Sequence, residues 1–457
     1  MVRPQTRRLL RWTAVLTASL PCFPVIAQDD ESWQRIKDAV NTEPAWAEGE
    51  LRKLCALGDD HDGEAPMYLA IAILRQESGS TSNPPSLERL REVICFSDSA
   101  LRRDKGLVAA RLVRAKASAQ LGDLDSATEQ CRRITELVQG DPKFSDVAKA
   151  AADMLDRLKP WSLSLRLSTS YDSDVPRVGR NVAAPQSFGV RDDFQFGSGV
   201  LFDYRAVANE RWGFHLGGAA SESWNTSLKA FDEQAYTPFA SLSVRATDRV
   251  SAGFDYAYQY TLLGRDDYLS QHTLRPYVSL RTAGSDQSTV FYEFNARRFF
   301  DIPSLTGTGP LDRTGDVHSV GFLHSRVLTS NTYGDVRVEL GYRHENVSTR
   351  GIEYDAENEV VTHSIRVPLS PSLELSVTSG WTWENYKRRS TFDAARQRRS
   401  DFVQSYGLAL TQVLNEHASI QAHVLWTDDE SSIRTRDGTD LFSYDRTLVE
   451  VALVLSF

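Results

Sequence analysis

The residues of this chain best suited to binding chemistry are acids and bases that alternate with apolar residues in its last two thirds. Within residues 335–345 the charged side chains fall at every second position or a multiple of it, so an extended strand carries them on one face. Eight residues of this kind are Asp255, Glu293, Arg297, Asp335, Arg337, Glu339, Arg343 and Glu345. Burial against an apolar core would be costly for such groups, whereas water solvates them. We expect them to line an enclosed aqueous space, either as contacts for a transported client or as a ladder of cross-strand ion pairs.

No catalytic constellation stands out in the sequence. It contains no nucleophile-elbow motif, no phosphate-binding glycine loop, no helical pair of metal-ligand histidines and no clustered cysteines. Histidines within expected strands are interpreted as solvated lumen or rim side chains, among them His272, His318, His324, His363 and His423. We therefore predict no enzymatic activity, no metal and no cofactor.

From residue 160 onward, apolar and polar residues alternate with a period of two, which is typical of the strands that would position these charges. In residues 250–262 one face is apolar or aromatic: Ala252, Phe254, Tyr256, Tyr258, Tyr260 and Leu262. Soluble sandwiches use strands of about five or six residues, whereas these runs of about 10–14 residues suit tilted membrane strands. Aromatic residues at run ends are expected to form girdles at headgroup level. They include Tyr258, Tyr260, Phe299, Phe300, Trp381, Trp383 and Tyr386.

The strand count is even. We expect about fourteen strands near 161–172, 192–207, 211–224, 234–246, 250–262, 269–282, 287–300, 316–328, 333–347, 358–369, 373–386, 400–414, 417–428 and 443–457. Connections alternate in length, with tight ones at 208–210, 247–249, 284–286 and 370–372 and long ones at 173–191, 301–315, 387–399 and 429–442. This pattern predicts an antiparallel transmembrane β-barrel at 160–457, with short turns on the periplasmic side.

The last expected strand has its apolar residues in phase. They are Val449, Val451, Leu453, Leu455 and Phe457. An alternating strand with an aromatic last residue resembles the signal that the outer-membrane barrel-assembly machinery recognises. The resemblance implies that this machinery and outer-membrane lipid are partners of the chain.

The first 27 residues have the composition of a secretory signal peptide. Four arginines precede or flank a short apolar run, and Val25-Ile26-Ala27 supplies a plausible cleavage site before Gln28. The run is too short for a membrane anchor and is interrupted by Pro21 and Pro24; Pro21 also argues against lipid modification of Cys22. Because the signal holds four arginines and no acid, its removal takes the net charge from −9 to −13. An excess of acids argues against nucleic-acid binding.

Residues 28–159 have helical spacing instead, which predicts six or seven helices. The stretch from Ala115 through Gly122 and Ala127 to Pro142 resembles a tetratricopeptide repeat, in which small residues let paired helices approach. An unrelated helical bundle is the alternative. Cys55, Cys95 and Cys131 occupy apolar helix positions and are expected to be buried core thiols.

This arrangement resembles that of the surface lipoprotein assembly modulators. The stretch Tyr171-Asp172-Ser173-Asp174-Val175 is similar to a run at the start of the barrel in that family, with Asp174 in place of an asparagine. The resemblance implies a periplasmic helical domain that captures a client protein, and an outer-membrane barrel that assists its export or surface display. The alternatives are an exopolysaccharide-export porin, whose client is a polysaccharide, and a simple solute pore.

Overall fold

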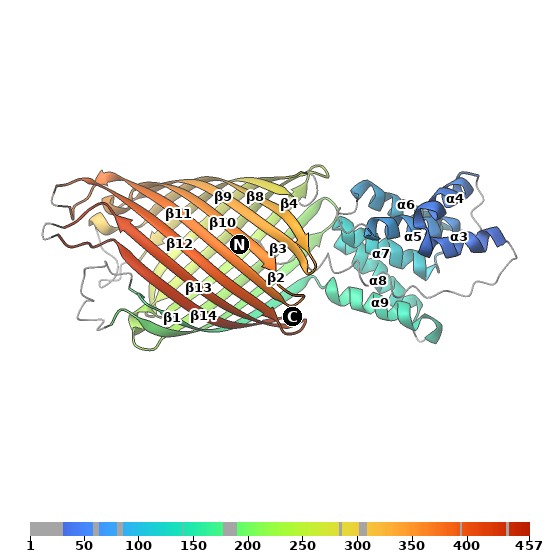
Figure 1. The fold of residues 1–457 in the computed structure, drawn as a ribbon, viewed down its shortest axis with the longest axis horizontal. Coiled ribbons are helices and arrows are strands. Elements are labelled where there is room, and N and C mark those ends of the chain that lie inside the picture. The colour runs from blue at the N-terminus through green and yellow to red at the C-terminus, as the bar shows by residue number, and fades with distance from the viewer. Residues whose placement is uncertain are drawn as a thin grey trace. The chain divides into compact units, whose positions relative to one another are not determined.

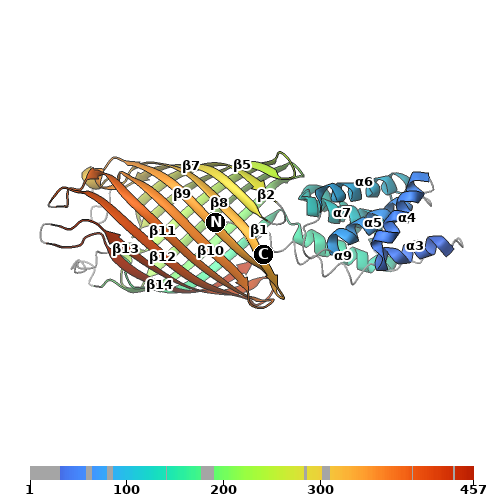
Figure 2. The same cartoon turned by 45° about the horizontal axis from the view of Figure 1, so that its top comes forward.

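The computed structural model describes residues 31–457 except 58–63, 80–85, 140, 177–189, 283–285, 301–308, 394 and 436–437. The expected signal peptide at 1–27 lies outside the described residues and stays a prediction. The chain divides into a helical unit and a β unit, and each is described by itself (Figures 1 and 2). No described helix combines the length and the apolar character needed to cross a membrane.

The helical unit contains seven described α-helices. They are α3 (Glu31–Thr42), α4 (Pro44–Leu57), α5 (Glu64–Gly79), α6 (Leu87–Arg103), α7 (Val108–Leu121), α8 (Leu124–Leu137) and α9 (Ser145–Arg157). Each helix packs against the next along the chain, and the odd-numbered helices also contact one another in series. A stack in which alternate helices meet along one side is typical of a helical repeat, and that side is the concave one. We call it the odd-helix face, formed by α3, α5, α7 and α9.

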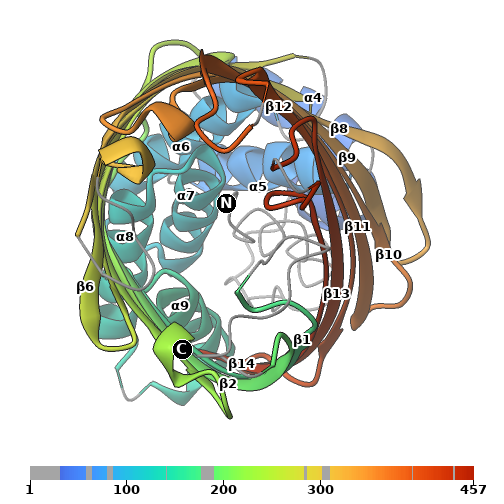
Figure 3. The same cartoon turned by 90° about the vertical axis from the view of Figure 1, so that its left-hand side faces the viewer.

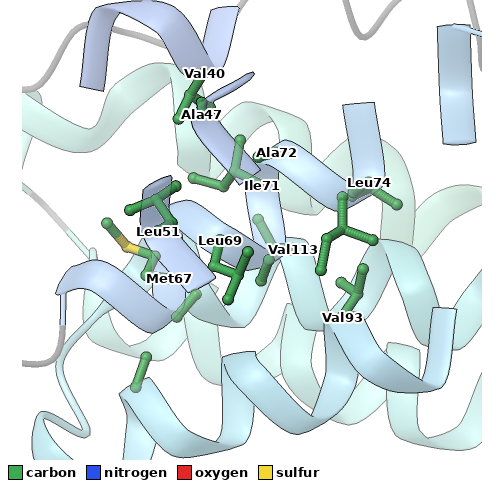
Figure 4. Packing of buried hydrophobic residues seen from close by; sticks show 14 of the residues in the cluster. Val40, Ala47, Leu51, Met67, Leu69, Ile71, Ala72, Leu74, Val93 and Val113 are labelled. Atoms are coloured by element: carbon green, nitrogen blue, oxygen red, sulfur yellow. The ribbon is translucent and has the colours of Figure 1, made fainter. Parts of the chain in front are cut away.

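The hairpin of α7 and α8 shows why the sequence folds in this way. Gly122 ends α7 in the left-handed region at φ 83°, and its N–H bonds the Ala119 carbonyl at 3.1 Å. Asp123 then caps α8 by accepting a 3.1 Å hydrogen bond from the Ser126 N–H. Ala119 and Ala127 are buried between the helices, where small side chains allow close approach. The predicted hairpin is thus present, and Figure 4 shows larger residues such as Leu51 and Leu69 in the neighbouring core cluster.

The prediction of three buried thiols is only partly right. Cys131 is fully buried and Cys55 is half-buried, but Cys95 is exposed. Helix α6 buries the face that contains Leu90 and Val93. Cys95 lies off that face, so the prediction was wrong for this residue.

The β unit contains fourteen strands that close into an antiparallel barrel (Figure 3). They are β1 (Trp161–Asp172), β2 (Asp193–Ala208), β3 (Trp212–Asn225), β4 (Glu233–Arg245), β5 (Val250–Leu263), β6 (Asp266–Arg281), β7 (Gln287–Phe299), β8 (Gly315–Asn331), β9 (Gly334–Thr349), β10 (Ala356–Pro368), β11 (Leu373–Arg389), β12 (Arg398–Val413), β13 (Ala418–Ser431) and β14 (Tyr444–Ser456). Closure is made by β1 and β14, whose register runs from Ser164 opposite Ser456 to Asp172 opposite Leu448. The predicted fold class, a helical region followed by a fourteen-stranded barrel, is confirmed.

The two ends of the barrel differ in their connections. We call the end where β1 begins the terminal end, and its turns are short. In the turn from β2 to β3, for example, the Asn209 N–H donates to the Trp212 carbonyl at 3.0 Å. At the opposite loop end most connections are longer and carry short 3-10 helices at 309–311 and 352–354. The exception is the turn from β5 to β6, where Gly264 and Arg265 both have positive φ. The predicted alternation of short and long connections therefore holds with this one exception.

The strand faces divide by polarity. Large apolar side chains at alternate positions are exposed on the barrel exterior, among them Leu167, Val200, Val278, Val320 and Val451. The intervening positions point inward. At two of them an aromatic ring covers a glycine of a neighbouring strand. A Cβ on Gly253 would lie within 2.3 Å of the Tyr277 ring, and a Cβ on Gly321 would lie as close to the Phe291 ring. Aromatic rings thus fill part of the interior wall.

Candidate functional site

The inward face carries a polar row that crosses neighbouring strands. Strand register places Glu293 opposite Ser319, Ser319 opposite Glu345, and Glu345 opposite Asn358. The row continues from Asn358 to Glu384 and from Glu384 to Asp401. We call these residues the lumen row: Glu293, Ser319, Glu345, Asn358, Glu384 and Asp401.

Four of the eight predicted lumen residues gather at the lumen row. Arg343 Nε lies 2.7 Å from Glu345 Oε1, and Asn358 Nδ2 donates to Glu345 Oε2 at 3.0 Å. Glu293 Oε1 accepts from Asn295 Nδ2 at 3.0 Å. Arg297 Nε donates to Gln271 Oε1 at 3.1 Å. This wall combines carboxylates, guanidinium groups and amides in two hydrogen-bonded clusters, one around Glu345 and one that joins Glu293 to Arg297 through Asn295 and Gln271.

The other four predicted residues lie apart from the lumen row. Asp255 on β5 accepts a 2.6 Å hydrogen bond from the Ser241 hydroxyl of β4. Asp335, Arg337 and Glu339 are near the start of β9, at the terminal end of the barrel. All of them share the inward phase, but the structure does not bring them together with Glu345. Their contact with a client remains a prediction.

Two features of the wall were missed in the sequence. Arg166 on β1 donates to Glu450 of β14 at 2.8 Å and to Gln421 of β13 at 2.9 Å, which ties three strands together. The second feature is the addition of Glu384 and Asp401 to the acidic row. The alternating phase marked both acids as inward, but only the register between strands shows that they are neighbours.

Tyr386 is a correction to the expected aromatic girdle. The girdle was predicted to include it beside Trp381 and Trp383, yet it is 7% exposed and lies inside the barrel. An odd number of positions separates Tyr386 from Trp381, so the two point to opposite faces. The Arg399 guanidinium stacks 4.0 Å from the Tyr386 ring centroid and pairs with Asp401 at 2.5 Å.

The histidines were also assigned partly to the wrong face. His272 Nδ1 lies 3.0 Å from the hydroxyl of Tyr256, and His318 Nδ1 lies 2.7 Å from that of Tyr292. Tyr292 is among the exposed exterior side chains. These histidines therefore belong to the exterior aromatic surface and not to the lumen, because they share the outward phase of the tyrosines.

The loop end is held together by side chains from separate connections. Glu353 is buried between β9 and β10 and accepts hydrogen bonds from Ser390 Oγ at 2.9 Å and from the Thr391 N–H at 2.5 Å. Arg313 stacks 4.4 Å from the Tyr354 ring centroid. In the part of the chain that the structure describes, these contacts link the β7–β8, β9–β10 and β11–β12 connections at the loop end.

The Tyr171–Val175 motif lies where the barrel closes. The Asp172 carboxylate is 1% exposed and pairs with Arg446 of β14. Its Oδ1 also accepts from the Asp174 N–H at 3.1 Å. The motif thus fastens β1 to β14 and starts the first loop, which is a structural role in this chain.

The final strand presents its apolar residues outward. Val449, Val451 and Leu453 are exposed on the barrel exterior. The Phe457 backbone pairs with Leu163, its N–H donating to the Leu163 carbonyl at 2.9 Å. The Phe457 ring is half exposed and stacks on His417. The outward apolar face of β14 is thus present, and its recognition by the barrel-assembly machinery stays a prediction.

The helical unit contains a buried ionic network between its helices. Glu48 of α4 accepts from Arg89 of α6 at 2.6 and 2.5 Å and from Gln76 of α5 at 2.6 Å. The hydrogen bonds from Arg89 lower the pKa of Glu48 to about 2, against the opposing effect of burial. The network joins three helices and is structural.

Comparison with known proteins yields fold likenesses and no family. No protein-family model matches the chain, and no curated protein matches it. The barrel is similar to a bacterial polysaccharide outer membrane secretin, at 14% identity and a TM-score of 0.34 over 65% of this chain and 98% of the other. It is also similar to OccAB3 of Acinetobacter baumannii, at 10% identity and a TM-score of 0.36 over 65% and 99% of the two chains.

The helical unit has a likeness of its own. It is similar to the Yersinia enterocolitica type III secretion chaperone SycD, solved with a peptide of the translocator YopD, at 15% identity and a TM-score of 0.24. The match covers 28% of this chain and 94% of the chaperone. At these scores and identities the likenesses carry no inference about substrate, so function must be inferred from the geometry of the chain itself.

Proposed function

We propose that this protein is an outer-membrane export barrel whose helical unit, in the periplasm, captures a client protein and delivers it for passage or surface display. The observation that supports this most directly is the closed fourteen-stranded barrel with exposed apolar residues outside and a charged row inside. Such a surface is stable only where lipid covers it. The charged interior then faces water.

The helical unit supports a protein client as the cargo. A solute pore needs only the barrel, whereas this chain also carries a separate stack of seven described helices. Helical repeats of this type present extended concave surfaces to extended partners.

Deletion of residues 31–158 tests the proposal. Cells that carry the deletion should lose one or a few proteins from the surface, measured by protease shaving and mass spectrometry, and retain them in the periplasm. The shortened protein should still form a heat-modifiable barrel on gels, which shows that assembly is intact. An unchanged set of surface proteins in cells with a folded barrel would refute the proposal.

A polysaccharide exporter is the second candidate, and the polar and aromatic inner wall of the barrel is the observation that supports it. Carboxylates, amides and aromatic rings such as Tyr277 and Phe291 can bind sugars as well as polypeptides. This function predicts loss of extracellular polymer in a knockout strain with surface proteins unchanged. The same shaving experiment therefore separates the two candidates.

A further inference from the structure

Two cations of the helical unit lack a partner among the described residues. Arg75 of α5 has its Nε buried without a hydrogen bond, and no ion pair or hydrogen bond joins Lys116 of α7 to any described group. Both side chains are half-buried. Burial lowers the pKa of Lys116, and repulsion from the positive charge of Arg75 lowers it further. The two like charges are thus within electrostatic reach of each other.

The other half-buried cations of α5, α6 and α7 each have a partner, although the Nε of Arg111 is also buried without a hydrogen bond. Arg89 pairs with Glu48 at 2.5 Å, and Arg114 pairs with Asp98 at 2.6 Å. Lys37, on the same side of the unit as Arg75, pairs with Glu64 at 2.7 Å. A buried unpaired charge is costly unless it serves a ligand. Arg75 and Lys116 are therefore candidates for binding an anionic ligand.

The contacts of α7 determine where Lys116 points. Arg111 donates to Gln130 of α8 at 3.1 Å, and Arg114 pairs with Asp98 of α6, so that side of α7 faces the even-numbered helices. Lys116 and Gln120 are four residues apart and lie together on the opposite side of α7. They therefore belong to the odd-helix face. The Oε1 of Gln120 is buried without a hydrogen-bond partner.

We propose that Arg75, Lys116 and Gln120 form a carboxylate-binding site on the odd-helix face, which takes an acidic segment of the client polypeptide. The two cations bind the carboxylate, and Gln120 Oε1 accepts a hydrogen bond from a neighbouring backbone N–H of the same segment. This inference rests on the proposed function, since it names the chemistry by which the helical unit recognises a protein client.

The number of cations at the site favours a peptide over an acidic polysaccharide as the ligand. A polyuronate carries a carboxylate on every sugar and needs a row of cations to match it. On the described odd-helix face Arg75 and Lys116 are half-buried cations without an ion pair, whereas Lys37 is paired with Glu64. Two cations and one acceptor match a single carboxylate and an adjacent amide. A peptide with one or a few acids supplies that combination.

Peptide binding to the full-length protein in detergent micelles tests the site. The probe is a fluorescent peptide of repeated Glu-Ala-Gly units with an amidated C-terminus, and its anisotropy reports binding. Two further probes replace glutamate by glutamine, one amidated and one with a free C-terminal carboxylate. Preference for the first probe identifies a side-chain carboxylate as the ligand, and preference for the free-carboxylate probe identifies a chain terminus; either supports the site.

Variants distinguish the site from general charge attraction. The double variant Arg75→Gln with Lys116→Gln should weaken binding at least about tenfold, the loss expected for hydrogen bonds to charged groups. Arg132→Gln on α8 is the matched control, because Arg132 is 61% exposed beside Glu129 and should leave binding unchanged. Arg75→Lys with Lys116→Arg keeps both charges and should retain most of the affinity.

Three results would overturn the inference. They are equal binding by the double variant, equal binding of all three peptide probes, and tighter binding of an oligouronate that depends on the same two cations. Failure here is distinct from failure of the proposed function. The deletion experiment can still show client loss when these two residues prove irrelevant, and peptide binding can persist when surface proteins do not change.

Discussion

Arg446 of β14 donates three hydrogen bonds of 2.9, 3.0 and 2.5 Å to the carboxylate of Asp172 on β1. The two residues lie 274 positions apart in sequence, and they join the first and last strands near the loop end of the barrel. Asp172 is 1% exposed, so the pair is shielded from solvent. This ion pair therefore stabilises the pairing of β1 with β14, which closes the barrel.

Removing either partner of this ion pair should weaken barrel closure. Asp172→Asn leaves Arg446 buried without a charge partner, a change worth about 3–5 kcal/mol. The temperature at which the folded band disappears on gels should drop by several degrees. Arg166→Gln is a comparison on the same strand pair, and since Arg166 is 39% exposed its effect should be smaller. An equal loss in both variants would contradict a special role for the buried pair.

Arg297 and Arg343, which lie beside the lumen row, should influence the ion selectivity of the barrel. Replacing Arg297 and Arg343 by glutamine removes two positive charges beside Glu293 and Glu345 and should shift the reversal potential in planar bilayers toward cation selectivity. Glu359→Gln is the matched control because Glu359 accepts from the exposed Tyr342 hydroxyl outside the barrel. A shift of equal size in the control would show that the row does not face the conducting path.

The period of two in the sequence is sufficient to predict most of the barrel. Alternation assigns Arg343 and Glu345 to one face, because a strand turns successive side chains to opposite sides. It cannot show that Glu384 and Asp401 are neighbours, since register depends on pairing between strands. For the same reason the contact of Arg166 with Glu450 was missed.

The helical unit shows a different limit of prediction. Apolar spacing located the helices, but an error in the buried face of α6 was enough to misplace Cys95. The unpaired state of Lys116 was equally invisible, because it depends on which acids the fold places nearby and not on Lys116 itself. The local sequence pattern thus predicts the helices and strands and which of their faces are buried. The contact partners of a side chain can be identified only from the tertiary structure.

Thiol reactivity should follow burial in the helical unit. Burial raises the pKa of Cys131 to about 11, so this thiol is protonated and shielded at neutral pH. Cys95 is exposed and should react with a maleimide within minutes in the folded protein, whereas Cys131 should react only after unfolding. Peptide mapping by mass spectrometry measures both rates. Labelling of Cys131 as fast as Cys95 would contradict the packing of α7 on α8.

Phe457, which directly follows β14, should matter for assembly more than for stability. Phe457→Ser removes an exterior ring but keeps the backbone pairing with Leu163. If the assembly machinery reads this residue, the amount of heat-modifiable barrel in cells should fall severalfold, while any barrel that forms should denature near the wild-type temperature. Leu410→Ser, another exposed apolar exterior residue, is the control and should assemble normally.

Replacing Lys116 by an apolar residue should stabilise the helical unit. The folded state holds a half-buried ammonium without a described partner, so Lys116→Met should raise the melting temperature at neutral pH by about 2–4 °C, as expected for a gain of roughly 1 kcal/mol. Circular dichroism at 222 nm follows this unit. If Lys116 were a structural contact, the same substitution would lower the melting temperature.

The pH dependence gives a second and independent test of Lys116. Its folded pKa lies below the reference value of 10.5, so the unfolded chain binds more protons between those two values. Stability from this residue should therefore rise as the pH rises through the folded pKa toward 10.5, and Lys116→Met should abolish that rise. An acidic peptide bound at the site should reverse the trend, because it stabilises the charged ammonium. If bound peptide leaves the alkaline stability profile unchanged, Lys116 does not contact the carboxylate.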